Sequence, residues 1–190
     1  MIKAIFLAAG QSKRLKYENK LVKRYKKTPL INHSLKVLHK SKVNKVIVVL
    51  GHQHKEVKKI ILKNKKNIFI YNKDYKKGMA SSIKVGLKKV ARNDKGFIVV
   101  QSDMPFIKKS DINKIYNSIK LKKFLVYVLK FKNKIGNPIG FDISLSKRFK
   151  KLKGEYGAKF MVKRLKNKTN FIKVNSSKVF KDFDLKKDFN

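Results

Sequence analysis

The amino-acid sequence predicts an α/β fold, with a mostly parallel sheet that carries helices on both faces. Apolar runs at residues 2–9, 45–50 and 96–101 contain almost no polar side chains, as is typical of strands buried on both faces of a sheet. Segments with apolar residues at helical spacing separate these runs, and this alternation indicates parallel strands joined by helices. No linker, repeat or low-complexity stretch interrupts the order, so we expect residues 1–190 to form a single domain.

The composition raises one competing class of function. The formal net charge is +40 at pH 7, and a strongly basic chain suggests a nucleic-acid partner. However, 46 of the 51 basic residues are lysine, only five are arginine, and the lysines are spread along the whole chain. A bias toward the AT-rich codons of Lys, Asn and Ile explains this pattern better than a nucleic-acid footprint does. We therefore expect no specific nucleic-acid partner, although the charge should steer phosphorylated substrates toward the protein.

Other classes are excluded by what the sequence lacks. There is no cysteine, so disulfide frameworks and thiolate metal sites are impossible. The apolar run at residues 2–9 is too short for a signal peptide, and no segment approaches the roughly 20 apolar residues that span a bilayer. We expect a soluble, cytoplasmic protein with no membrane partner.

The first strand and the loop after it form the segment from Ile2 to Lys20. Gly10 ends the apolar run, and a small, polar and basic loop follows. A glycine at this position lets backbone N–H groups approach a phosphate closely, and Arg14 and Lys20 can fold back onto the same polyphosphate. The loop matches neither the P-loop nor the dinucleotide-binding pattern, and an ordinary strand-to-helix turn is the alternative.

The elements that follow are predicted from caps and periodicity. Thr28 is expected to cap a helix whose first residue is Pro29 and which ends near Lys40. Farther along, a loop that contains Gly78 leads to a serine-capped helix, whose N-terminus can attract an anion. Ser81 or Ser82 is expected to cap that helix. The other predicted elements are a helix around Val57, strands at residues 67–71, 124–131 and 170–174, and a helix capped by Ser110 and Asp111.

Three carboxylates stand out in a chain that has only 11 acidic residues. Asp103 follows the buried strand at residues 96–101, where it can cap the next turn or hold Mg²⁺, a cation that prefers carboxylate and phosphate oxygens. Near the other end of the chain, Asp182 and Asp184 alternate with an aromatic residue, which puts both carboxylates on one side of an extended segment. A solvated turn is the alternative there.

Short motifs follow one another along nearly the whole chain. They are LAAGQSKR at residues 7–14 with Asn19 and Lys20, GMASSIKVGL at 78–87, SDMP at 102–105, GNP at 136–138, GEYGAK at 154–159 and DFD at 182–184. Their co-occurrence in this order resembles the MobA-like nucleotidyltransferases, and most closely the molybdenum cofactor cytidylyltransferases. The chain departs from the family pattern at Ser102, which replaces a glycine, and at Asn137, which replaces a histidine.

The resemblance implies a Rossmann-like nucleotidyltransferase fold of the GT-A kind and a set of residue roles. Arg14 and Lys20 would neutralise the triphosphate, and Asp103 would act in catalysis and share Mg²⁺ with Asp184. The residues expected to contact the nucleotide are Leu7, Ala8, Ala9, Gly10, Ser12, Gly78 and Ser82, and those expected to face the acceptor are Asn137 and Pro138.

The resemblance also implies the reaction, which would be transfer of CMP from CTP to the phosphate of the molybdopterin cofactor with release of pyrophosphate. The Ala8-Ala9-Gly10 sequence is the cytidylyl form of the family's loop. A molybdoenzyme or its chaperone would be a further partner. The alternatives are a nucleotidyltransferase that uses a sugar, polyol or lipid phosphate and, from a different class, a basic nucleic-acid-binding protein.

Overall fold

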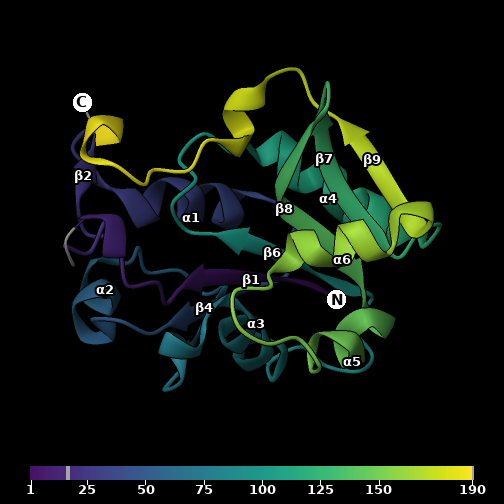
Figure 1. The fold of residues 1–190 in the computed structure, drawn as a ribbon, viewed down its shortest axis with the longest axis horizontal. Coiled ribbons are helices and arrows are strands. Elements are labelled where there is room, and N and C mark those ends of the chain that lie inside the picture. Colours follow the sequence, from purple (N-terminus) through teal and green to yellow (C-terminus); the bar gives the residue numbers. More distant parts are fainter. Residues whose placement is uncertain (16–17, 190) are drawn as a thin grey trace.

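The computed structural model of the chain describes residues 1–15 and 18–189, apart from the side chain of Arg14. Its centre is a seven-stranded sheet in the order β5-β4-β1-β6-β8-β7-β9 (Figure 1). The strands are β1 (Ile2–Ala8), β4 (Lys45–Leu50), β5 (Asn67–Tyr71), β6 (Gly96–Gln101), β7 (Val126–Phe131), β8 (Lys134–Asp142) and β9 (Thr169–Lys173). The predicted α/β fold with a mostly parallel sheet is confirmed.

The sheet has a parallel half and a mixed half. Strands β5, β4, β1 and β6 run parallel to one another, whereas β8 lies antiparallel between β6 and β7. The edge strand β9 is parallel to β7. Parallel strands point their carboxyl ends to the same edge of the sheet, so the loops after β1, β4 and β6 meet there.

Helices cover both faces of this sheet, as predicted. Alternate side chains of β1 point to opposite faces, so Phe6 packs in one apolar cluster and Ile5 in the other. The helices that pack in the Phe6 cluster are α1 (Leu30–Lys40), α2 (His54–Ile60) and α4 (Lys109–Leu121), and those in the Ile5 cluster are α3 (Met79–Leu87), α5 (Ser146–Phe149) and α6 (Ala158–Arg164). Within the described residues, no helix has the length and apolar character needed to cross a bilayer.

The predicted helix caps need correction. Thr28 and Pro29 are not helical: they form β3 (Thr28–Pro29), which pairs with β2 (Arg24–Tyr25), and α1 begins at Leu30. The helix predicted to start after Ser81 or Ser82 begins at Met79, with Gly78 at its N-cap position. The two serines therefore lie inside the first turn.

The cap predicted for the fourth helix is also shifted. Helix α4 begins at Lys109, so Ser110 and Asp111 lie in its first turn. The Asp111 carboxylate accepts a hydrogen bond from the Lys108 backbone N–H at 2.9 Å. An acidic side chain at this third position satisfies one of the donors that a helix start leaves free.

Strand β8 was not predicted, because its sequence contains two glycines and a proline, which are unusual in a central strand. The structure accommodates Pro138 at an irregularity in the pairing. Val128 of β7 pairs with Ile139, but its neighbour Leu129 pairs with Gly136. Asn137 and Pro138 thus stand outside the ladder, and the missing N–H of the proline breaks no strand pairing.

A buried ion-pair cluster closes the amino-terminal edge of the sheet. The Lys3 ammonium lies 2.9 Å from the Asp94 carboxylate and donates to the Lys89 carbonyl. The Ala91 backbone N–H donates to the same carboxylate, and the amino group of Met1 lies 3.3 Å from it. Burial opposes ionisation of Asp94, but the hydrogen bonds from Lys3 and Ala91 outweigh it and lower the pKa of this carboxyl group.

Candidate active site

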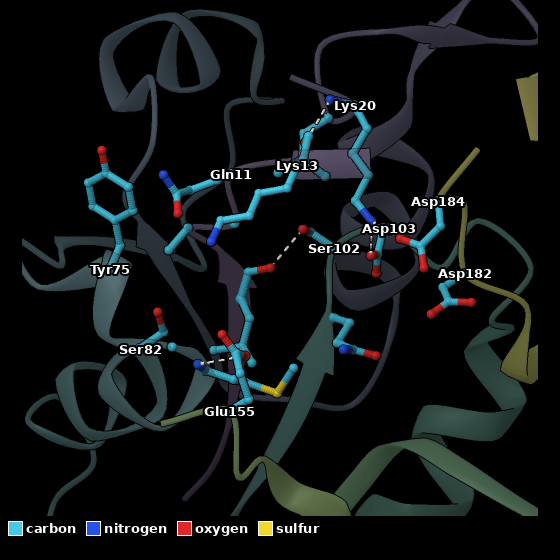
Figure 2. Close-up of a pocket in the computed structure, with 18 of the residues that line it drawn as sticks. Gln11, Lys13, Lys20, Tyr75, Ser82, Ser102, Asp103, Glu155, Asp182 and Asp184 are labelled. Carbon is cyan, nitrogen blue, oxygen red and sulfur yellow. Dashed lines mark hydrogen bonds and ion pairs between the residues drawn. The ribbon is translucent and has the colours of Figure 1, made fainter. Parts of the chain in front are cut away.

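A cavity of about 500 Å³ opens at the carboxyl ends of β1 and β6 (Figure 2). Three parts of the chain supply its walls: the loop after β1, the start of α3, and the segment around Asp182. The residues that line the cavity are Leu7, Ala9, Gly10, Gln11, Ser12, Lys13, Lys20, Leu21, Tyr75, Lys76, Gly78, Met79, Ser82, Gln101, Ser102, Asp103, Glu155, Asp182 and Asp184.

The loop after β1 folds back on itself. Ser12 adopts a left-handed conformation with φ 51°, and its side-chain oxygen accepts a hydrogen bond from the Lys20 backbone N–H at 3.0 Å. Next to the loop, Gly51 at the end of β4 leaves no room for a side chain, because an added Cβ would lie 2.7 Å from the Cβ atoms of Ala9 and Tyr75. The loop is therefore held in place at both of its ends.

The N-terminus of α3 forms the second wall and is bound to a later loop. Gly78 has φ 93°, and a Cβ there would lie 2.5 Å from the Gly154 carbonyl oxygen. This close approach lets the Ala80 N–H donate to that carbonyl at 3.1 Å. The Glu155 carboxylate accepts from the Met79 N–H at 3.3 Å. The sequence GEYGAK thus contacts the first turn of α3, and its Glu155 also lines the cavity itself.

The third wall is the segment around Phe183, which lies across the end of β6. The Phe183 backbone N–H donates to the Asp103 carbonyl at 3.0 Å. Its ring is 1% exposed and packs against the rings of Tyr25, Phe106 and Phe189. Because the residues on either side of Phe183 are carboxylates, this anchor brings both of them beside Asp103.

Three carboxylates converge at this point. Asp103, Asp182 and Asp184 each offer a carboxylate oxygen, and these oxygens all lie within 4.8 Å of one another. Like charges at this distance repel, and burial makes the repulsion stronger. The cluster is therefore suited to hold a cation.

The Lys20 ammonium lies between two of these carboxylates. Its Nζ is 2.6 Å from Asp103 Oδ2 and 2.6 Å from Asp184 Oδ1 (Figure 2). Burial alone would lower the pKa of Lys20, but the two carboxylates outweigh it and raise that pKa above its ordinary value. The other oxygen of Asp103, Oδ1, is buried and has no hydrogen-bond partner among the described residues.

The serine that replaces the family's glycine does not enter the carboxylate cluster. The Ser102 hydroxyl donates to the Leu7 carbonyl at 2.7 Å, and the Ser102 carbonyl accepts from Ser34 at 3.1 Å. The side chain is thus engaged with β1 (Figure 2). Ser102 strengthens the junction between β1 and β6 and leaves the space beside Asp103 open.

The predicted acceptor residues do not line the cavity. The Asn137 side chain is buried, and its Nδ2 donates to Gln101 Oε1 at 2.8 Å. Gln101 does line the cavity, so Asn137 affects the cavity only by positioning the Gln101 side chain. Since the Gln101 oxygen accepts from Asn137, its amide N–H groups are the atoms left for a ligand.

The structure therefore brings together most, but not all, of the predicted site residues. Ala8 is buried and does not line the cavity, and the side chain of Arg14 lies outside the described residues. The predicted residues that do line it are Leu7, Ala9, Gly10, Ser12, Lys20, Gly78, Ser82, Asp103 and Asp184.

Sequence reasoning missed several residues of the cavity. Asp182 was not among the predicted metal ligands, yet its carboxylate lies in the cluster with those of Asp103 and Asp184. Gln101 is two residues before Asp103, and the period of two along an extended chain places both on the same side, a signal that could have identified it. Gln11 and Lys13 belong to the predicted loop and line the cavity beside Gly10.

A loop after the first strand, a helix start and a carboxylate cluster around one cavity define a nucleotidyltransferase. The chain matches the MobA-like NTP transferase domain over residues 4–169 and belongs to that family. This match ends before the segment that contains Asp182 and Asp184.

Solved structures share the fold at low sequence identity. Rv0371c from Mycobacterium tuberculosis superposes with a TM-score of 0.86 and 21% identity, covering 99% of this chain and 95% of that one. A second structure of Rv0371c is a complex with manganese, with a TM-score of 0.82 and 19% identity over 99% of this chain and 95% of that one. Molybdopterin-guanine dinucleotide biosynthesis protein A from Archaeoglobus fulgidus gives a TM-score of 0.73 and 16% identity, over 98% of this chain and 94% of that one.

Among curated sequences, the bifunctional protein GlmU of Clostridioides difficile is 29% identical over 140 residues. The match covers 73% of this chain but only 29% of that protein. The chain thus spans less than a third of the length of this relative.

Proposed function

We propose that the cavity binds CTP and that the protein transfers CMP to the phosphate of molybdopterin, with release of pyrophosphate. Residues 1–190 would act as one nucleotidyltransferase domain. The observation that carries the proposal is that the loop after β1 and three carboxylates share one cavity in a chain with a net charge of +40. A cation-binding cluster beside a phosphate-binding loop is what transfer of a nucleotidyl group requires.

A divalent cation fits the carboxylate cluster. The oxygens of Asp103, Asp182 and Asp184 lie within 4.8 Å of one another, and Asp103 Oδ1 is buried without a partner among the described residues. Mg²⁺ and Mn²⁺ prefer such oxygen ligands, and the manganese complex of Rv0371c shows that a protein with this fold binds one of them. When bound, the ion would supply positive charge to the phosphates and orient the α-phosphate.

The other steps fall to side chains and backbone groups of the chain. Backbone N–H groups of the loop around Gly10 would hold the triphosphate. An oxygen of the acceptor phosphate would attack the α-phosphorus in line, and the bond from that phosphorus to the bridging oxygen would break, so that pyrophosphate leaves with the electron pair. Lys20 and Arg14 would stabilise the charge on the departing group. This route needs no covalent nucleophile on the protein.

The choice of base is assigned to the start of α3 and to Ala9. Gly78 and Ser82 both line the cavity, and the Ala8-Ala9-Gly10 form of the loop supports CTP. We expect CTP to be preferred over GTP, and Ala9→Gly to reduce this preference by about tenfold, or roughly 1.4 kcal/mol. Equal turnover of both nucleotides by the wild-type protein would contradict the assignment.

The most specific part of the proposal is the acceptor, molybdopterin, which rests on the relation of this family to molybdopterin proteins. The structural similarity to the Archaeoglobus fulgidus molybdopterin-guanine dinucleotide biosynthesis protein supports it. The curated relative described above bears a different name, GlmU, so sugar, polyol and lipid phosphates are tested in parallel.

The experiment is a pyrophosphate-release screen of the four ribonucleoside triphosphates against molybdopterin and a set of sugar, polyol and lipid phosphates, with Mg²⁺ and with Mn²⁺. We expect release only with CTP and molybdopterin together. Pyrophosphate release with a sugar phosphate and not with molybdopterin would show that the acceptor is a sugar phosphate. No release with any combination of nucleotide and acceptor would overturn the proposed function. Binding to duplex DNA that survives 200 mM salt, well beyond the range of weak electrostatic attraction, would favour the nucleic-acid alternative.

A further inference from the structure

Lys20 occupies the position that a divalent cation would take. Its ammonium contacts Asp103 and Asp184 at 2.6 Å each, and these are two of the three carboxylates whose oxygens lie within 4.8 Å of one another. The Lys20 side chain is 15% exposed, so few water molecules can screen the pairing. A bound ion and this ammonium therefore compete for the same oxygens.

A divalent ion would reach more of this cluster than the ammonium does. The oxygens of all three carboxylates lie within 4.8 Å of one another, whereas the Lys20 ammonium contacts two of the three residues. Moreover, Asp103 Oδ1 is buried and has no partner among the described residues. A divalent ion in the place of the ammonium would supply one more positive charge and could also bind the third carboxylate.

We propose that Lys20 holds the carboxylate cluster together in the nucleotide-free protein and moves to the triphosphate when the metal–nucleotide complex binds. This inference rests on the proposed function for the second position of the lysine. In its first position, Lys20 holds together carboxylates that would otherwise repel one another. It also makes the cluster a poor binding site for a metal ion without a nucleotide. Because Lys20 leaves the carboxylates only when a triphosphate is present, the metal and the nucleotide bind together.

The movement requires only the side chain of Lys20. Its backbone N–H is fixed by the Ser12 hydroxyl at 3.0 Å, so the base of the side chain stays at the loop. The flexible four-carbon chain of a lysine carries a compact charge that can change position by rotation. Lys20 and the loop residues Gly10 and Ser12 line the same cavity, so the ammonium can reach phosphates held there without leaving it.

The first test measures binding of Mn²⁺ alone by electron paramagnetic resonance, with no nucleotide present. In Lys20→Met the competing ammonium is absent, and we expect Mn²⁺ to bind at least about tenfold more tightly than in the wild type. Lys13→Met is the matched control, because Lys13 also lines the cavity and its removal changes the charge of the site equally. We expect this control to change the affinity by less than about threefold. Equal affinities in the two variants would overturn the proposal.

A second measurement covers the case in which the carboxylates repel one another too strongly for Lys20→Met to fold. Lys20→Gln is then used, because its amide can donate to one carboxylate. Saturating Mn²⁺ should raise the Tm of either Lys20 variant more than that of the wild type or of Lys13→Met. Equal Tm shifts in all proteins would contradict the competition between the lysine and the ion.

The position of Lys20 in the loaded protein is the last check. In crystals grown with Mn²⁺ and CTP, the ammonium should contact phosphate oxygens, and an ammonium that still lies about 2.6 Å from both carboxylates would refute the movement. The Mn²⁺ affinities do not depend on turnover. If Lys20→Met binds Mn²⁺ about tenfold more tightly but no nucleotide and acceptor release pyrophosphate, only the proposed function is refuted. If pyrophosphate is released but the Mn²⁺ affinities of Lys20→Met and Lys13→Met are equal, only the role of Lys20 is refuted.

Discussion

The two ends of β6 carry lysine–aspartate clusters of opposite design. At the amino-terminal end, the Asp94 carboxylate meets two cations, the Lys3 ammonium and the amino group of Met1. At the carboxyl-terminal end, Lys20 meets Asp103 and Asp184, with Asp182 beside them. The first cluster is buried at the amino-terminal edge of the sheet, with 8% of the Lys3 side chain and 1% of the Asp94 side chain exposed. The second opens into a cavity.

The difference distinguishes an ion pair that only stabilises the fold from one that we propose takes part in the function. At the Asp94 cluster two cations lie beside one carboxylate, so no further cation is needed to balance its charge. At the Asp103 cluster three carboxylates lie close together beside a cavity, in a chain that is otherwise strongly basic. Carboxylates this close repel one another, and their position beside a cavity supports the proposal that they bind a cation.

The largest expected effect is on catalysis, at the carboxyl-terminal cluster. Asp103→Asn should lower kcat by about 1,000-fold or more, which is roughly 4 kcal/mol in transition-state stabilisation, because the amide cannot hold the cation as the carboxylate does. Asp184→Asn should have a similar effect, and the double variant should be little worse than either single one, since the two act as a unit. Steady-state kinetics of pyrophosphate release measures all three.

The fold should be nearly unaffected by these changes, because removing one carboxylate also relieves repulsion. We expect the Tm of Asp103→Asn to match or exceed that of the wild type. A variant that loses activity only because it unfolds would place Asp103 in the same structural class as Asp94 and break the comparison.

The second effect is on stability, at the amino-terminal cluster. Asp94→Asn leaves the buried Lys3 ammonium without its carboxylate and should lower the free energy of unfolding by about 3 kcal/mol, as expected for breaking a buried pair. Turnover below the melting transition should not change. The control is Asp74→Asn, which breaks the exposed Asp74–Lys77 pair and should cost less than about 1 kcal/mol. Equal losses in the two variants, measured by urea unfolding, would show that the Asp94 cluster has no special role.

A smaller effect is expected beside the Asp103 cluster, at Gln101. Gln101→Glu keeps the shape and still accepts from Asn137, but it replaces amide N–H donors with a negative charge that repels a phosphate. We expect the KM of one phosphorylated substrate to rise about tenfold, roughly 1.4 kcal/mol, with little change in Tm. Gln53→Glu is the control, because Gln53 is exposed and does not line the cavity. Unchanged kinetics would show that the amide does not contact substrate.

The smallest expected effect is the dependence on acidic pH of the stability that Asp94 contributes. The pKa of Asp94 in the folded protein lies below its ordinary value of 3.8, so the unfolded chain binds a proton first as the pH falls. The stability from this pair is thus present above about pH 5 and is lost as the pH falls through the folded pKa. The difference in the free energy of unfolding between the wild type and Asp94→Asn should shrink over that range. A constant difference down to acidic pH would mean that ionisation of Asp94 does not stabilise the fold.

The parallel half of the sheet was predictable because its chemistry is local. The runs in β1, β4 and β6 are apolar on both faces, and this pattern alone identifies a buried strand. The pattern fails for β8, where Pro138 and two glycines argue against a strand. Only the pairing with β6 and β7 and the irregularity beside Leu129 make that strand possible, and these are tertiary facts.

The site was predictable to the extent that its residues belong to motifs. Lys20 and Asp103 were expected to act on the same substrate, but not to contact each other, because the two lie 83 positions apart in the sequence. Asn137 was expected to face the acceptor, yet it donates to Gln101 instead. No pattern in one sequence states which buried amide meets which neighbour, since this depends on the register of strands drawn from distant segments.

The backbone hydrogen bond from Phe183 to Asp103 gives the site an order of construction. A ribosome delivers the chain from its amino terminus, so the loop after β1 and all four parallel strands leave the exit tunnel well before Asp182 and Asp184. Until that late segment docks, Lys20 has one carboxylate partner instead of two, and the cluster lacks two of its three acids. In a nascent chain the loop after β1 can therefore form early, while the carboxylate cluster is completed only when a segment translated much later has docked.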